Sequence, residues 1–326
     1  MRFWHCVVKP HHLSPRKLFF NSATNLIIRS MLLLIRWLSR WRLSTLQALG
    51  GLMGWLAYAL SPGYRQRLGS NAAAAGLAPA DRRRAVAQSG RMVAELPWLW
   101  LRPASRPLGA LVQWQGDGLI SSALDDGRGL VLLTPHLGCF EVCAQAIAEQ
   151  FGHRTRLTAM YRPARQPWLR TLEESARARP GLATAPAALA GVRQMIRALR
   201  RGEAVGLLPD QVPPEGMGVW APFFGRPAYT MTLATRLVQQ TGAALLLIWA
   251  ERLPAGRGFV LRVSRLAQPL PTAAIDDAAL QLACATALNQ EMAGLIAQAP
   301  SQYLWGYHRY KQPRRVHAVT GDEAAP

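Results

Sequence analysis

The chain has 326 residues, of which half are hydrophobic and only 17% are charged. This length allows one large domain or two ordinary ones, and the composition excludes a disordered protein, a coiled coil and a collagen-like chain. Four scattered cysteines are too few for a disulfide framework and predict reduced thiols in a cytosolic environment.

The charge balance is unusual, because 38 Lys and Arg residues face 18 Asp and Glu residues, which leaves a net charge of +20. A surplus of this size predicts anionic partners: nucleic acid, acidic lipid headgroups, a phosphorylated substrate or an acidic carrier protein. Compositional bias is the alternative, and the arginine run 82–84 fits a solvated surface.

The N-terminal part of the chain suggests attachment to a membrane. Residues 1–30 show neither a hydrophobic period nor a good signal peptide, so we expect a basic extension outside the fold. Residues 43–60 are uncharged, and their 18 positions approach the roughly 20 apolar residues of a spanning helix. Tryptophans and arginines flank them, as at a membrane interface. We predict a membrane-anchor helix within 31–62; a buried core helix is the alternative, and the sequence does not decide whether 43–60 span the membrane or lie in it.

Further along, a basic helical region at 64–107 gives way to apolar strands that alternate with helices. We expect strands at 129–134, 157–161, 204–208, 243–250 and 259–263, and helices at 141–151, 192–201, 232–241 and 276–298. This alternation predicts an α/β domain over 63–311, with a mostly parallel central sheet flanked by helices. Residues 312–326 are expected to form a loose tail.

The segment from Thr134 to Glu141 follows the first of these strands, at the edge of an α/β sheet where sites form. His136 and Glu141 are five residues apart, so they can meet only across a turn, which Pro135 and Gly138 would permit. A carboxylate on one imidazole nitrogen fixes the tautomer and makes the other nitrogen more basic. The pair is therefore a candidate general base for a hydroxyl. A helix-capping histidine beside a solvated glutamate is the alternative.

Covalent and metal-dependent chemistry have weaker support in the sequence. There is no Gly-x-Ser-x-Gly elbow for a serine nucleophile. Cys139 and Cys143 make a thiol nucleophile or a zinc site conceivable, but a closed zinc site needs four ligands. We expect both thiols to be small buried groups, and we expect no metal.

Several motifs together carry a family resemblance. The spacing His136-x4-Glu141 after an apolar strand resembles the His-x4-Asp/Glu motif of glycerolipid acyltransferases. Downstream blocks sharpen this to the bacterial lipid A late acyltransferases, the lauroyl and myristoyl transferases of lipopolysaccharide synthesis. The blocks are Tyr161-Arg162-Pro163, Leu208-Pro209-Asp210-Gln211, Ala221-Pro222-Phe223-Phe224-Gly225 and Tyr303-Leu304-Trp305 through Arg309-Tyr310-Lys311. The resemblance covers about residues 31–311, and His308 departs from it where the family more often has arginine.

The resemblance implies a glycerolipid acyltransferase-like fold and acyl transfer from acyl-carrier protein to a sugar-linked hydroxyl of a lipid A precursor. His136 would take the proton of the hydroxyl, with no covalent enzyme intermediate. The implied partners are acyl-carrier protein, an anionic phosphorylated glycolipid acceptor and inner-membrane lipid, with no cofactor and no nucleic acid. The implied location is the inner membrane, with the catalytic domain on the cytoplasmic side.

The same resemblance implies four substrate-binding residues: Arg162, Arg177, Asp210 and Arg309. Arg162 precedes a proline, so we expect it in an extended or turn segment, where its planar guanidinium could bind a phosphate or pair with an acid. Asp210 follows a predicted strand, where an isolated aspartate is often a helix N-cap. The segments 213–218 and 222–225 are expected to be loops that shape the acyl or acceptor pocket.

Three other functions remain open at this stage. The acceptor could be another membrane lipid, such as a lysophospholipid or an aminolipid. The charge alone would suit a nucleic-acid-binding protein, although the sequence lacks zinc-finger spacing and an RNP-like aromatic block. A membrane-associated scaffold without catalysis is the third.

Overall fold

The computed structural model describes residues 28–315 apart from 104, 162, 163, 165, 178 and 274. Most of the predicted extension (1–30) and tail (312–326) therefore lies outside the described residues. Residues 28–38 are helical and lead into the first long helix.

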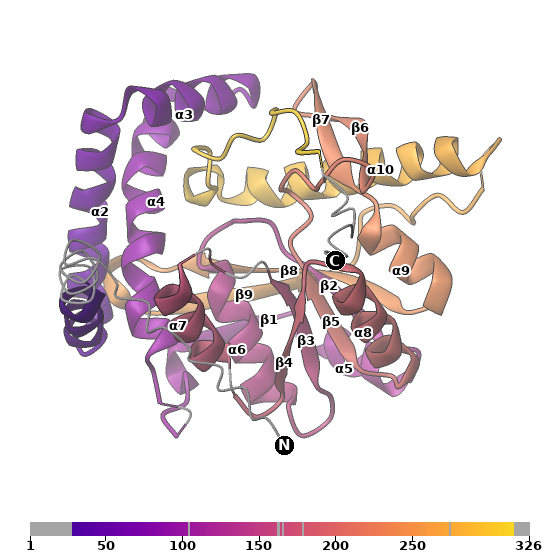
Figure 1. Ribbon diagram of the computed structural model, residues 1–326, viewed down its shortest axis with the longest axis horizontal. Helices are drawn as coiled ribbons and strands as arrows, with labels where there is room; N and C mark the ends of the chain where they lie inside the picture. Colours follow the sequence, from indigo (N-terminus) through magenta and orange to yellow (C-terminus); the bar gives the residue numbers. More distant parts are fainter. Residues whose placement is uncertain are drawn as a thin grey trace, which may run out of the picture.

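A seven-stranded sheet forms the centre of the described chain, in the order β1-β9-β8-β2-β5-β3-β4 (Figure 1). The strands are β1 (Val112–Gln115), β2 (Leu130–Leu133), β3 (Leu157–Tyr161), β4 (Leu182–Pro186), β5 (Ala204–Leu207), β8 (Ala244–Arg252) and β9 (Phe259–Ser264). Only β8 and β9 pair antiparallel, and every other neighbouring pair in this sheet is parallel. The prediction of a mostly parallel sheet is confirmed.

Helices cover both faces of this sheet, so its central strands are buried on both sides. Along β2, Val131 and Leu133 belong to one hydrophobic cluster while Leu130 and Leu132 belong to the other, as the two-residue period of a strand requires. The first cluster is shared with α8 (Leu189–Arg200), α9 (Leu233–Thr241) and α10 (Asp277–Gln298). The second is shared with α5 (Gly118–Asp125) and α6 (Phe140–Phe151). The helices flanking the sheet are confirmed as well.

One predicted loop is instead part of a hairpin. Strands β6 (Gly218–Phe223) and β7 (Arg226–Met231) pair antiparallel through the two-residue turn Phe224-Gly225. Both turn residues have positive φ, 46° and 71°, the geometry that joins antiparallel strands most tightly. The prediction of a loop over 222–225 is therefore wrong for its first half, since Pro222 and Phe223 end a strand. Sequence reasoning also missed β1, β4, α5 and α7 (Pro167–Arg177).

The uncharged segment forms one helix, α2 (Leu43–Leu60), with the predicted bounds. It leads through α3 (Pro62–Ala74) to α4 (Pro79–Trp100), and α2 and α4 lie side by side (Figure 1). The glycines of α2 permit this contact. A Cβ on Gly54 would stand 2.3 Å from the carbonyl oxygen of Val86, and one on Gly90 would stand 2.0 Å from that of Gly50.

Among the described residues, α2 is the one helix long and apolar enough to cross a membrane, and 33% of that segment is buried in the fold. Its other face is open to solvent, with Leu52 68% exposed, Leu56 56% and Leu60 73%. The segment is thus neither a fully buried core helix nor a helix free of the domain.

Candidate active site

The parallel pairing of β2 with β5 places His136 beside Asp210. Leu133 is aligned with Leu207, and each stands three residues before one of the two side chains. The Thr134 N–H donates to the Leu207 carbonyl and extends the pairing past the strand ends. Two segments 74 residues apart thereby meet at the carboxyl edge of the sheet, where α/β folds build their sites.

Asp210 holds His136 through both of its carboxylate oxygens. Oδ1 lies 2.7 Å from the imidazole Nδ1, and Oδ2 accepts the backbone N–H of His136 at 2.9 Å. The Asp210 side chain is 2% exposed. Burial by itself would raise the pKa of Asp210, but the charge and hydrogen bonds of His136, together with the Arg309 charge, leave that pKa below its usual value. An ionised Asp210 keeps the proton of the neutral ring on Nδ1, so Nε2 carries the free lone pair.

That lone pair is covered by the amide of the next residue in the motif. Gln211 Nε2 lies 2.8 Å from His136 Nε2. Because Nδ1 carries the proton, the contact is an amide N–H donating to the basic nitrogen. Both side chains line the same cavity.

The predicted hydrogen bond between His136 and Glu141 is wrong, because other side chains occupy both ring nitrogens. Glu141 lies in the first turn of α6 and points to another partner. Its Oε1 lies 3.6 Å from Arg177 Nη2, and its Oε2 accepts from the Trp100 indole at 3.4 Å. Glu141 still lines the cavity beside His136, so its predicted catalytic role stays a proposal.

Arg177, at the end of α7, stands between two carboxylates and two aromatic rings. Beside its contact with Glu141, Nη1 lies 3.9 Å from Glu173 Oε2. Its guanidinium lies over the rings of Tyr161, at 5.3 Å, and Trp100, at 5.9 Å. These contacts hold a cation in the wall of the cavity, and the substrate-binding role that the resemblance implies for Arg177 stays a prediction.

Arg309 does not line this cavity. It is 2% exposed and donates to the Tyr229 carbonyl at 2.7 Å and to Thr230 Oγ1 at 2.8 Å, which braces β7. Its charge also helps to lower the pKa of Asp210, and its predicted contact with substrate stays a prediction. The predicted substrate-binding Arg162 lies outside the described residues.

Gln211 and Tyr303 are two neighbours of the dyad that sequence reasoning did not single out. Burial first, and then the Asp210 charge, raises the pKa of Tyr303 well above its usual value, so its hydroxyl stays neutral beside the carboxylate. Both residues lie inside the quoted family blocks, which was the available signal.

The cavity that these residues share has a volume of about 420 Å³ and is mostly apolar beyond the polar end. The apolar lining comes from β3, β5, the end of β7, α8 with the residues before it, the loop after Asp210 and the start of α9. It includes Met160, Ala187, Leu189, Val192, Leu207, Val212, Pro213, Pro214, Met217, Met231 and Leu233. Pro213, Pro214 and Met217 of the segment 213–218 line this cavity, and no residue of 222–225 does. That the cavity is the acyl or acceptor pocket stays a prediction.

Cys139 and Cys143 are both buried. Burial raises the pKa of Cys143 to about 12 and that of Cys139 well above its usual value. Both thiols are thus protonated at neutral pH, and a protonated thiol is a poor nucleophile. The candidate base at this site is therefore His136 Nε2, whose lone pair accepts from the Gln211 amide.

Comparison with known proteins agrees with this geometry. Residues 30–312 match the family model described as bacterial lipid A biosynthesis acyltransferase. The chain is 27% identical over 223 residues to a lipid A biosynthesis lauroyltransferase of Escherichia coli (strain K12), covering 68% of each chain. It is also 26% identical over 226 residues to a lipid A biosynthesis palmitoleoyltransferase of the same organism and to a lipid A biosynthesis acyltransferase of Shigella flexneri, with 68% of each chain covered.

Proposed function

Since the chain belongs to the bacterial lipid A biosynthesis acyltransferase family, we propose that it transfers a fatty acyl chain from acyl-carrier protein to a hydroxyl of a lipid A precursor in lipopolysaccharide biosynthesis. The observation that carries this proposal is the His136–Asp210 dyad at the polar end of an otherwise apolar cavity. A base next to an apolar slot suits a reaction that joins a long hydrocarbon chain to an alcohol.

The dyad supplies each proton transfer that the reaction needs. His136 Nε2 takes the proton of the acceptor hydroxyl while its oxygen attacks the thioester carbonyl carbon. Asp210 stabilises the imidazolium that forms. When the tetrahedral intermediate collapses, the C–S bond breaks and His136 returns the proton to the leaving sulfur. The products are an ester and the free thiol of the carrier, and the enzyme is unchanged.

Gln211 must move aside for this step, because its amide nitrogen lies within hydrogen-bonding distance of His136 Nε2. The acceptor hydroxyl has to stand at the same distance for its proton to be transferred. In the proposed reaction the acceptor hydroxyl therefore replaces the Gln211 amide at His136 Nε2.

The apolar part of the cavity is where we place the donor's acyl chain. Its walls are aliphatic side chains and prolines, and Val192 and Leu189 of α8 stand on one side. Burying a methylene group contributes roughly 0.8 kcal/mol, so a long chain gains affinity from filling this space.

Membrane attachment is proposed through the exposed face of α2. A spanning arrangement would draw α4 into the bilayer as well, because the two backbones touch at Gly50, Gly54 and Gly90. Helix α4 carries Asp81, the arginine run 82–84, Arg91 and Glu95. Charged residues at the centre of a bilayer cost about 3 kcal/mol each. We therefore place α2 in the plane of the interface, with Leu52, Leu56 and Leu60 in the acyl region.

Anionic partners are suggested by an arginine-lined hollow of about 420 Å³ between helix 28–38 and the end of α4. Arg36, Arg40, Arg102 and Arg106 line it, and no carboxylate is among its lining residues in the described chain. Burial, and the nearby charges of Arg106 and Arg179, lower the pKa of Arg102 although Glu149 opposes this. Such a cluster favours a phosphate or a carboxylate, in keeping with a phosphorylated acceptor or an acidic carrier protein.

The direct test is acyl transfer from an acyl-carrier thioester to a phosphorylated lipid A precursor by the purified full-length protein. His136→Ala should abolish the transfer and keep the fold. His153→Ala is the matched control, because His153 is exposed and does not line the cavity. Mass spectrometry of lipid A from a deletion strain gives the same answer in the cell. If lipid A from the deletion strain keeps all of its acyl chains, and the purified protein transfers none in vitro, the proposed function is overturned.

Attachment is tested with lipid vesicles that contain anionic phospholipid. Leu52→Glu/Leu56→Glu should release the protein into the soluble fraction after flotation. Leu282→Glu on α10, also an exposed leucine, should not. Full retention of the double variant would show that this face is not the attachment surface.

A further inference from the structure

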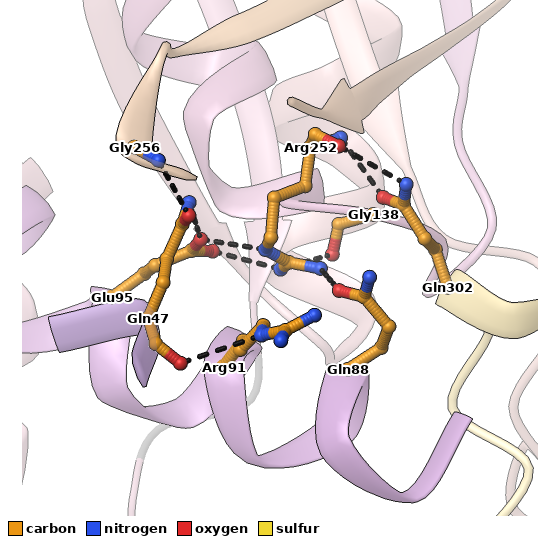
Figure 2. A network of polar contacts seen from close by, with 8 residues as sticks. All are labelled: Gln47, Gln88, Arg91, Glu95, Gly138, Arg252, Gly256 and Gln302. Carbon is orange, nitrogen blue, oxygen red and sulfur yellow. Dashed lines mark hydrogen bonds and ion pairs between the residues drawn. The ribbon is translucent and has the colours of Figure 1, made fainter. Parts of the chain in front are cut away.

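A buried ion pair joins α4 to the end of β8, outside the proposed catalytic cavity. Arg252 donates from Nε to Glu95 Oε1 at 2.5 Å and from Nη2 to Glu95 Oε2 at 2.7 Å (Figure 2). The two side chains are 2% and 0% exposed. This bidentate geometry fixes the plane of the guanidinium as well as its position.

The same guanidinium reaches the turn that carries His136. Nη2 also donates to the carbonyl oxygen of Gly138 at 3.1 Å, and Nη1 donates to Gln88 Oε1 at 2.9 Å (Figure 2). Gly138 has a φ of 62°, and a Cβ there would stand 1.8 Å from the Ala250 carbonyl. The turn is pressed against the end of β8, and Arg252 holds the carbonyl two residues beyond the base.

Backbone contacts complete the turn's support. The Leu304 N–H donates to the His136 carbonyl at 3.1 Å, and the Gly138 N–H donates to the Gln302 carbonyl at 3.0 Å. The side-chain amide of Gln302 brackets the backbone of Arg252, accepting from its N–H at 2.8 Å and donating to its carbonyl at 3.1 Å. The Arg252 side chain joins this assembly to Gln88 and Glu95 of α4 by hydrogen bonds.

On its other side, Glu95 connects to α2. Gln47 Nε2 donates to Glu95 Oε1 at 2.9 Å, and Gln47 Oε1 accepts the backbone N–H of Gly256 at 2.9 Å (Figure 2). Gln47 is 4% exposed. A continuous set of buried hydrogen bonds therefore runs from the helix that we place at the membrane, through α4 and β8, to the turn with His136.

We propose that Glu95 and Arg252 are positioning residues for the acyl transfer, fixing the turn that presents His136 and tying it to α2 and α4. The inference rests on the proposed function. The competing explanation is that the pair only stabilises the fold. Buried ion pairs are often replaced by apolar residues of similar volume with little or no loss of stability. An apolar pair, however, cannot donate to the Gly138 carbonyl.

The experiment compares the wild type with Glu95→Leu/Arg252→Met in the acyl-transfer assay. We expect kcat to fall by about tenfold or more, because small displacements of a reacting group are costly, whereas KM should change little. The cavity lining, which determines KM, is untouched by these substitutions. The matched control is Glu251→Leu/Arg262→Met, a partly exposed ion pair on β8 and β9 in which Arg262 donates to Glu251 and to Gln115.

Hydrogen exchange provides a readout that does not depend on activity. Peptides that span Thr134–Val142 should exchange faster in the Glu95/Arg252 double variant, while peptides from β9 should not. Unchanged protection of the turn would overturn the inference even if the wild type transferred no acyl group. An inactive wild type whose turn loosens as expected would overturn the proposed function alone.

Arg252→Lys decides the matter if the double variant fails to fold. It keeps a positive charge beside Glu95 but lacks the planar fork that reaches Glu95, Gln88 and Gly138 together. A reduced kcat with an unchanged KM supports the positioning role. A wild-type kcat in Arg252→Lys, or in the folded double variant, overturns it.

Discussion

The His136–Asp210 dyad is tested most sharply by Asp210→Asn, which keeps the volume of the side chain and removes its charge. The carboxylate accepts two hydrogen bonds from one residue, from the ring Nδ1–H at 2.7 Å and from the backbone N–H at 2.9 Å. An amide has one acceptor oxygen and one NH₂ group, so it can accept only one of these bonds.

Either orientation of the new amide is damaging. If its oxygen accepts the backbone N–H, its NH₂ group faces Nδ1 and moves the ring proton to Nε2, so the base loses its lone pair. If its oxygen accepts Nδ1–H, two donors face each other at the backbone, at a cost of roughly 1–3 kcal/mol. The first arrangement avoids that cost, and loss of the correct tautomer lowers kcat by about 10⁴-fold in the serine protease that serves as the reference case. We expect a fall of about 10³- to 10⁴-fold here.

The assay is steady-state transfer from the acyl-carrier thioester across the neutral pH range, with thermal melting to confirm that each variant is folded. Glu141→Gln is the matched comparison, because it also turns a carboxylate of this site into an amide. It should lower kcat by loosening Arg177, yet leave the pH at which activity falls on the acid side unchanged. A folded Asp210→Asn with near-wild-type kcat would refute the dyad. A shift of the acid limb in Glu141→Gln would mean that Glu141 acts on His136 after all.

Four further outcomes are expected. The pKa of Asp210 is lower in the folded than in the unfolded chain. The ionised carboxylate therefore stabilises the fold above the ordinary aspartate pKa of 3.8, and this stabilisation is lost as the pH falls through the lower folded value. Urea midpoints measured down through that pH range should drop more in the wild type than in Asp210→Asn. Gly54→Ala should lower stability by about 1–3 kcal/mol by forcing α2 and α4 apart, whereas Gly69→Ala in α3, where a Cβ meets nothing within 4 Å, should be neutral or stabilising in the same melts. Val192→Phe should shift the ratio of kcat/KM values toward shorter acyl donors by about tenfold or more, and an unchanged ratio would place the acyl chain elsewhere. Added salt should lower kcat/KM more than kcat, because charges further apart than about 8 Å are screened at physiological ionic strength, and a flat kcat/KM would make the charge of +20 a compositional bias.

Most strands of the sheet were predictable because each is a short apolar run with turn residues beside it, whereas β1 and β4 were missed. The run 129–134 is apolar, short and preceded by a glycine turn, and β2 occupies 130–133 of it. The helix 43–60 was predictable for a similar reason, yet its partner was not. The sequence of that segment does not distinguish close packing of Gly50 and Gly54 against α4 from packing against another helix in a membrane, because both environments favour small residues.

The site was only half predictable, for a physical reason that His136 illustrates. Spacing along the chain favoured Glu141 as its partner, since that carboxylate is five residues away. In the structure the partner is Asp210, because the parallel pairing of β2 with β5 brings together two segments that no local sequence pattern connects. Pairing across a sheet is non-local, whereas motif spacing is local, so family resemblance marked both residues for the site but could not show which carboxylate holds the ring.

Asp210 and Glu141 have different roles in the proposed reaction because their carboxylates contact different groups. Asp210 is buried, receives two hydrogen bonds from His136 and lies near the Arg309 charge, so it stays ionised and orients the base. Glu141 faces Arg177, a cation also held by Glu173 and two aromatic rings. In the proposed reaction, Asp210 therefore orients the proton acceptor, and Glu141 holds a positive charge in the same cavity. In the acyl transfer that we propose both are needed, because the alcohol loses a proton while negative charge builds on the carbonyl oxygen of the acyl donor.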